Sequence, residues 1–167
     1  RRQRQMCIRD SEDTHGGNTA MGHLALRALN AGADAYNVAV GYLAGLNVST
    51  GKYNTLVGAG GGDTLTTGEY NTIMGYAALS AENDHGKNVA IGAFALTALD
   101  AGAEAENVAL GFKAASGMST GQYNIAIGSR AIQTGATTGN NNIAIGYLSG
   151  STLTSGTKNI VIGSQAG

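Results

Sequence analysis

The chain has 167 residues, a formal net charge of −1 and only 13% charged side chains, so it lacks the positive field that nucleic-acid binding requires. Its single cysteine, Cys7, excludes an internal disulfide framework, and no apolar run is long enough for membrane insertion. With no tryptophan, two phenylalanines, 27 glycines and no proline, the composition excludes a thick aromatic core. It favours a thin core of Ala, Val, Ile and Leu in a backbone whose amides all join hydrogen-bonded ladders.

Residues 1–17 carry several charges and no repeat, so we expect them to form a connecting or poorly ordered segment. Residues 18–167 form one repeat domain. Because the chain begins without Met and stops a few residues after the last repeat, we also expect it to be part of a longer protein.

From residue 18 onward, one five-residue pattern recurs: an Asn, three apolar or Thr residues, and a Gly. Counted from one motif Asn to the next, the successive spacings are 19, 17, 17, 17, 19, 17, 18 and 17. Self-similarity at such a short period is typical of stacked solenoids, so the pattern predicts an all-β, parallel β-solenoid or β-roll of 17–19-residue coils. The structural repeat residues are Asn18, Asn37, Asn54, Asn71, Asn88, Asn107, Asn124, Asn142 and Asn159, with Gly22, Gly41, Gly58, Gly75, Gly92, Gly111, Gly128, Gly146 and Gly163.

The three residues between Asn and Gly are apolar on both faces of the predicted strand. Side chains alternate along a strand, so Val89 and Ile91 share one face while Ala90 points the other way. We expect the first and third residues to fill the coil. The middle row would then face outward and need a partner outside the coil. The alanines of that row are Ala20, Ala39, Ala90, Ala109, Ala126 and Ala144.

Each motif Gly is followed by a second apolar segment, such as Ala95-Leu96, and then by a polar turn, such as Ser49-Thr50-Gly51. We interpret the apolar segment as a second short strand in each coil. A helix over 25–33 or 93–101 is the weaker alternative, because Gly recurs too often for capped helices. Asn side chains stacked in register are expected to form a ladder from coil to coil.

A longer rhythm is superimposed on the coils. Residues 29–35 match residues 99–105, and these segments lie in the two 19-residue units. Insertions in solenoids map to loops that are often used for contact, so Asn30, Asp34, Asp100 and Glu104 are candidate contact residues. At about 4.8 Å per coil, the two loops would lie about 19 Å apart.

The most enzyme-like group is Glu82, Asp84 and Asp100, which lie at similar places in adjacent coils. Retaining glycosidases need two carboxylates about 5 Å apart, but a solvated acidic turn fits the same residues. Three unrelated His positions, and a glycine-rich segment at 58–63 without a following Lys-Ser/Thr pair, do not indicate a metal or phosphate site. We expect no catalysis, no cofactor and no metal.

Tyr36, Tyr53, Tyr70 and Tyr123 directly precede a motif Asn and could form an external row that contacts glycans or protein. Lateral packing within an oligomer is the favoured interpretation of this row.

The segment Thr66–Leu79 resembles repeats of bacteriophage tail-fibre proteins and related bacterial fibres, of the type that precedes an endosialidase-like intramolecular chaperone. Asn88–Gly92 is similar to the head repeats of trimeric autotransporter adhesins. The resemblance implies a homotrimer of parallel β-rolls with the small-residue face on the threefold axis. It also implies an extracellular place, on a virion fibre or a bacterial cell surface, and a host-surface glycan or protein as partner. A tail-fibre segment is the leading interpretation, a bacterial adhesin head the first alternative and a carbohydrate-cleaving tail spike the second.

Overall fold

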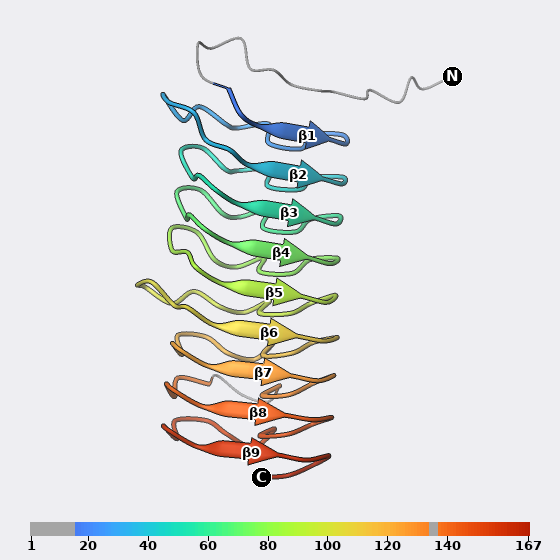
Figure 1. Ribbon diagram of the computed structural model, residues 1–167, viewed down its shortest axis with the longest axis vertical. Coiled ribbons are helices and arrows are strands. Elements are labelled where there is room, and N and C mark those ends of the chain that lie inside the picture. Colours follow the sequence, from blue (N-terminus) through green and yellow to red (C-terminus); the bar gives the residue numbers. More distant parts are fainter. Residues whose placement is uncertain (1–15, 134–136) are drawn as a thin grey trace, which may run out of the picture.

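The computed structural model describes residues 16–133 and 137–167. Nine three-residue strands form one sheet in the order β1 to β9, and every neighbouring pair is parallel. The strands are β1 (Thr19–Met21), β2 (Val38–Val40), β3 (Thr55–Val57), β4 (Thr72–Met74), β5 (Val89–Ile91), β6 (Val108–Leu110), β7 (Ile125–Ile127), β8 (Ile143–Ile145) and β9 (Ile160–Ile162). Figure 1 shows them stacked as the rungs of a rod. This confirms the predicted parallel β-solenoid of about eight turns.

The stacking is in register along the whole rod. The middle residue of each strand pairs with the middle residue of the next, as Ala90 does with Ala109 and Ala39 with Leu56. Residues at the same distance from the motif Asn therefore form columns parallel to the rod axis, and each column has one environment.

The middle residue of each strand points into the coil, which is the reverse of the sequence prediction. Ala20 is 3% exposed, and Ala39, Ala90, Ala109, Ala126 and Ala144 are 0% exposed within the single chain. The first and third strand residues are half-buried or exposed. Assigning these six alanines to a trimer interface is therefore wrong. The interior of the coil is narrow, and alanine fits it because larger side chains such as Leu26 and Leu96 fill the opposite wall.

The predicted second strand is also wrong, because the segment after the motif Gly curls instead of extending. Its alternate residues take left-handed backbone angles, for example φ 61° at Phe94 and 51° at Leu96. Turn hydrogen bonds follow these residues, for example from the Leu99 N–H to the Leu96 carbonyl at 3.2 Å. Left-handed L-residues cost roughly 1–2 kcal/mol each. Bonds between coils, such as the Leu96 N–H to the Ala114 carbonyl at 3.0 Å, offset this cost.

The motif Gly column brings backbone against backbone. A Cβ on Gly92, whose φ is 129°, would stand 2.3 Å from the carbonyl oxygen of Gly111. The same short approach recurs at the other motif glycines up to Gly146. Any side chain here would push two coils apart, which explains why the motif always ends in Gly.

The motif Asn column is buried and forms the predicted ladder. The backbone N–H of Asn107 donates to Oδ1 of Asn88 at 3.1 Å, and Asn124 donates in the same way to Asn107 at 2.8 Å. The Asn107 side-chain nitrogen donates to the Gly121 carbonyl at 2.7 Å. Asn107 thus joins its own strand to the neighbouring coils and to the returning turn, so its amide is satisfied without water.

Candidate self-association face and contact loops

The outward columns of the strands form an apolar face along the rod. One column holds Thr19, Val38, Thr55, Thr72, Val89, Val108, Ile125, Ile143 and Ile160, and the other holds Met21, Val40, Val57, Met74, Ile91, Leu110, Ile127, Ile145 and Ile162. Met21 is 46% exposed and Leu110 43% exposed. No charged residue occurs in either column. Apart from three threonines, the face consists of Val, Ile, Leu and Met, and in the single chain it meets solvent.

Aromatic side chains border this face on both sides. Before the strands, Tyr36, Tyr53 and Tyr70 are about half exposed and stack with ring centroids 5.7 and 4.9 Å apart. After the strands, Phe94 packs edge-on between Tyr76 and Phe112 at 5.2 and 6.3 Å. The stacked tyrosines cover one another's ring faces and present their edges outward. They therefore suit lateral packing better than a flat platform for a sugar ring.

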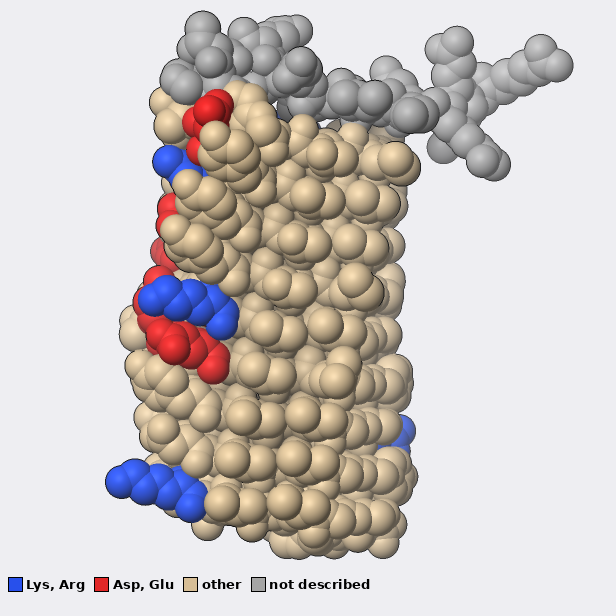
Figure 2. All heavy atoms as spheres, viewed as in Figure 1, with Lys and Arg blue, Asp and Glu red and all other residues tan. Residues whose placement is uncertain are grey.

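Charge is segregated from much of the surface. In Figure 2, Asp, Glu, Lys and Arg side chains gather mainly along one edge of the rod, and the broad surface beside it carries almost none. In the same view of Figure 1, this edge holds the turns that lead into the strands. The rod thus has a polar edge suited to water and an uncharged flank suited to association.

The two long-coil loops project from this edge. In Figure 1, the loops before β2 and β6 extend beyond their neighbours. Asn30, Asp34, Asp100 and Glu104 are all exposed. Asp34 accepts hydrogen bonds from the Gly16 N–H at 2.7 Å and from the Tyr36 hydroxyl at 3.2 Å, and this second bond and the Asp34 charge raise the pKa of Tyr36.

Lys87 forms two exposed ion pairs at the second loop. Lys87 Nζ lies 3.7 Å from a carboxylate oxygen of Glu104 and 3.7 Å from one of Glu106. Exposed pairs of this kind contribute little to stability, so they orient the loop more than they hold it.

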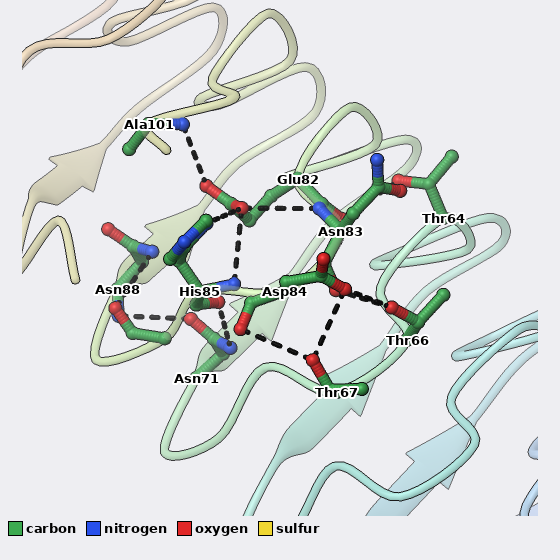
Figure 3. A network of polar contacts seen from close by, with 11 residues as sticks. Thr64, Thr66, Thr67, Asn71, Glu82, Asn83, Asp84, His85, Asn88 and Ala101 are labelled. Carbon is green, nitrogen blue, oxygen red and sulfur yellow. Dashed lines mark hydrogen bonds and ion pairs between the residues drawn. The ribbon is translucent and has the colours of Figure 1, made fainter. Parts of the chain in front are cut away.

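The enzyme-like carboxylates do not form an open pair. Glu82 is 0% exposed, whereas Asp84 and Asp100 are exposed. Figure 3 shows the Asp84 carboxylate directed toward Thr66 and Thr67, whose hydroxyls donate to it, while the Glu82 carboxylate is directed toward Ala101 and His85. The hydroxyls of Thr66 and Thr67 lower the pKa of Asp84. A carboxylate enclosed by protein donors cannot reach a polysaccharide, and the alternative of a solvated turn does not describe Glu82 either.

Sequence reasoning missed the burial of Glu82, although a signal for it was present. Glu82 stands at the place in its coil where other coils carry Val48, Leu65, Leu99 and Met118, all buried. A single carboxylate in an apolar column predicts a buried, hydrogen-bonded group.

Within residues 16–133 and 137–167, no three His, Cys, Asp or Glu side chains come together as metal ligands, and no helix is long and apolar enough to cross a bilayer. Cys7 and His15 lie outside these ranges.

Comparison of the chain with family models, with curated proteins and with solved structures finds no match.

Proposed function

We propose that this chain is a shaft or head segment of a homotrimeric fibre on a virion or a bacterial cell surface. In this role it spaces and presents a host-binding region, and its two long-coil loops contribute to contact with the host surface. The observation that supports the proposal best is the uncharged apolar face formed by the outward strand columns.

The size of this face favours association. Eight steps of about 4.8 Å make it about 38 Å long, and the stretch from the position before each Asn to the third strand residue spans about 13 Å. The resulting area of roughly 500 Å² is at the upper end of what monomers leave exposed, before Tyr42, Tyr76, Phe112 and Tyr147 are added. The largest apolar patch of a monomer, which reaches this size, is often functional.

The periodicity of the face favours another copy of this chain as the partner. Its apolar rows recur at every coil, and Met74, Ile91 and Leu110 follow one another without a charged residue between coils in that column. Only a partner with the same axial repeat places a side chain into every gap along the rod. Parallel copies around a common axis meet this condition, and the number three comes from the resemblance to fibre repeats.

The mechanism of such a segment is mechanical. Each coil adds a rung of backbone hydrogen bonds, a motif Asn and one layer of core, so the rod can transmit load along its axis. The protruding loops then offer exposed Asp34, Asp100 and Glu104, with backbone carbonyls and amides, to a host glycan or protein.

The proposal is tested by measuring molar mass with light scattering. The wild-type chain is expected to have the mass of three copies, and Ile91→Asp is expected to give a smaller species with an unchanged circular dichroism spectrum. Thr120→Asp places the same charge on an exposed turn and is expected to remain trimeric. A monomeric wild type, or an Ile91→Asp trimer, would contradict the proposal, and a stable dimer would contradict its symmetry.

A bacterial adhesin head and a carbohydrate-cleaving tail spike are the two alternative functions. A bacterial adhesin head has the same solenoid, so the sequence that flanks this domain in its gene would distinguish it from a virion fibre. No observation favours a carbohydrate-cleaving spike, because burial of Glu82 leaves its candidate acid without access to substrate.

A further inference from the structure

Glu82 stands out as a fully buried carboxylate in a column that is otherwise apolar. Its position in the stack is specific. It closes the 17-residue coil that spans positions 71–87, directly before the 19-residue coil that spans positions 88–106. The hydrogen bonds around it show how the chain passes from one coil length to the other.

In coils that precede a coil of ordinary length, the turn is held by a backbone carbonyl of the next coil. The N–H groups of Ser49, Thr50 and Gly51 converge on the Thr66 carbonyl at 2.9, 3.3 and 3.2 Å. Those of Thr66 and Thr67 converge on the Asn83 carbonyl at 2.6 and 3.3 Å. These donors lie at equivalent places in their coils, because Ser49 and Thr66 follow their motif Asn at the same interval.

At the junction with the long coil, a side chain takes the place of that carbonyl. The N–H groups of Asn83 and His85 donate to Oε1 of Glu82 at 3.2 and 3.3 Å, and His85 Nδ1 lies 3.1 Å from the same oxygen. The other oxygen, Oε2, accepts the N–H of Ala101 at 3.3 Å. As Figure 3 shows, the carboxylate thus joins the turn of one coil to the enlarged loop of the next.

The motif Asn changes partner at the same junction. Asn37, Asn54 and Asn107 donate their side-chain N–H to a Gly carbonyl at the far end of their own coil. In the two long coils the donor instead turns back to the Gly just before it. Asn88 donates to Gly86 at 3.1 Å, and Asn18 donates to Gly16 at 3.3 Å.

The residues involved recur in the sequence before the other long coil. Glu82, His85, Gly86 and Asn88 match Glu12, His15, Gly16 and Asn18 in type and in mutual spacing. The chain has only three His, and no third Glu-x-x-His-Gly occurs in it. Glu12 and His15 lie outside the described residues, but Gly16 makes the same bond to its Asn as Gly86 does.

We infer that Glu82, with His85 and Gly86, is an adapter that lets a 17-residue coil stack on a 19-residue coil and fixes the protruding loop 99–105. The insertion in the long coil displaces the carbonyl that would otherwise hold the turn. The side-chain oxygens of Glu82 supply acceptors for both sides of the gap, and burial of this polar group is tolerated because three backbone N–H groups donate to it and the His85 ring lies beside it. This role belongs to the single chain and does not depend on the proposed trimer.

A double-mutant cycle between Glu82 and the coil length tests the inference. Glu82→Leu restores the residue type of Leu65 and Leu99 and is made in two chains, the wild type and one in which segment 100–106 is replaced by the shorter segment 49–53. The replacement brings the long coil to the ordinary length, so its carbonyl can again accept the turn. The readouts are the thermal midpoint and the hydrogen exchange of individual amides.

In the wild-type chain, Glu82→Leu is expected to lower the midpoint and to speed exchange at Asn83, His85 and Ala101 by ~10-fold or more, since these amides lose their acceptor. In the shortened chain, the same substitution is expected to leave the midpoint unchanged or to raise it. Folding of Glu82→Leu in the shortened chain alone would also support the adapter.

Equal shifts of the midpoint in the two chains, or unchanged protection of Ala101, would overturn the inference. If Glu82→Leu folds in neither chain, Glu82→Gln decides, because it keeps the volume and one carbonyl acceptor. Glu82→Gln is expected to speed exchange on the side that its amide NH2 group faces, either at Ala101 or at Asn83 and His85, and unchanged protection of all three would overturn the adapter. Glu69→Gln removes the same charge from the neighbouring coil and serves as the matched control.

Discussion

Leu56 occupies the space that the absent side chain of Gly62 leaves in the coil. A Cβ on Gly62 would stand 2.8 Å from Cδ2 of Leu56, and both residues are buried. In some other coils the sizes are reversed, with Ala90 opposite Leu96 and Ala20 opposite Leu26 in the same two columns. Coil 71–87 instead carries two large residues there, Ile73 and Leu79, so large-small pairing is not general. Leu56 and Gly62 are one such pair, in which a large and a small residue share the space.

Exchanging the two sizes should be better tolerated than changing either one. Leu56→Ala is expected to lower the free energy of unfolding by about 2–5 kcal/mol because it leaves a cavity, and Gly62→Leu by about 1–3 kcal/mol through overpacking. The double variant recreates the Ala–Leu pair and is expected to be more stable than Leu56→Ala, although Ile73 must shift slightly. Denaturant unfolding at one fixed protein concentration checks this, and strictly additive losses would contradict paired packing.

Substitution of Gly92 and of Gly102 by Ala distinguishes the cost of a clash between coils from the cost of an unfavourable backbone angle. Both have positive φ, but a Cβ on Gly92 would meet the backbone of Gly111 at 2.3 Å, whereas nothing lies within 4 Å of a Cβ on Gly102. Gly92→Ala is expected to cost about 3 kcal/mol or more, and Gly102→Ala only about 1 kcal/mol. Comparable thermal midpoints for the two variants would show that the glycine column does not set the spacing of the coils.

Because of the Asn ladder, loss of one motif Asn is expected to lower the free energy of unfolding much more than loss of an exposed Asn. Asn107→Ala removes the acceptor of the Asn124 N–H and the donor to the Gly121 carbonyl. Leaving these buried groups unpaired is expected to cost about 2–4 kcal/mol. Asn47 donates to the Asp63 carbonyl at 2.7 Å from an exposed position, so Asn47→Ala is expected to cost less than about 1 kcal/mol. Calorimetric unfolding of both variants tests the difference.

Asp84 links stability to acid pH. Hydrogen bonds from Thr66 and Thr67 lower its pKa in the folded chain below the usual value of about 3.9 for Asp. A lowered folded pKa means that the carboxylate favours folding above the unfolded value, and that this contribution is lost as pH falls through the folded value. Thr66→Val is expected to raise the pKa of Asp84 and to reduce stability at neutral pH more than at about pH 2. A carboxyl NMR titration with an unmoved Asp84 would contradict this.

The strand positions and their parallel order follow from the sequence because the motif repeats almost without interruption. A Gly that admits only backbone contact and an Asn that bonds to the next Asn leave one register for each strand. Coil boundaries are therefore predictable from the spacing alone.

Which face of the strand is inside does not follow from hydrophobicity, since Val89, Ala90 and Ile91 are all apolar. Room decides it. The middle column holds mostly Ala because the coil is narrow, while the bulkier Val and Ile remain half-buried outside. The size of the residues was the available signal, and hydrophobicity alone was the wrong measure.

Residue propensities could not predict the curled conformation of the segment after each motif Gly. Leucine and phenylalanine rarely adopt left-handed angles, and here bonds to the neighbouring coils impose them at Leu79 and Phe94. Glu82 differs, because comparison of columns would have exposed it as the one acid in an apolar row.

The in-register stacking also makes the distance between the two protruding loops a whole number of coils. Duplication or loss of the 17-residue unit 54–70 would move one loop along the axis by about 4.8 Å and leave the hydrogen bonds of Glu82 to the second loop in place. Recombination within such a gene can therefore change the spacing of the two loops in discrete steps without any change in either loop.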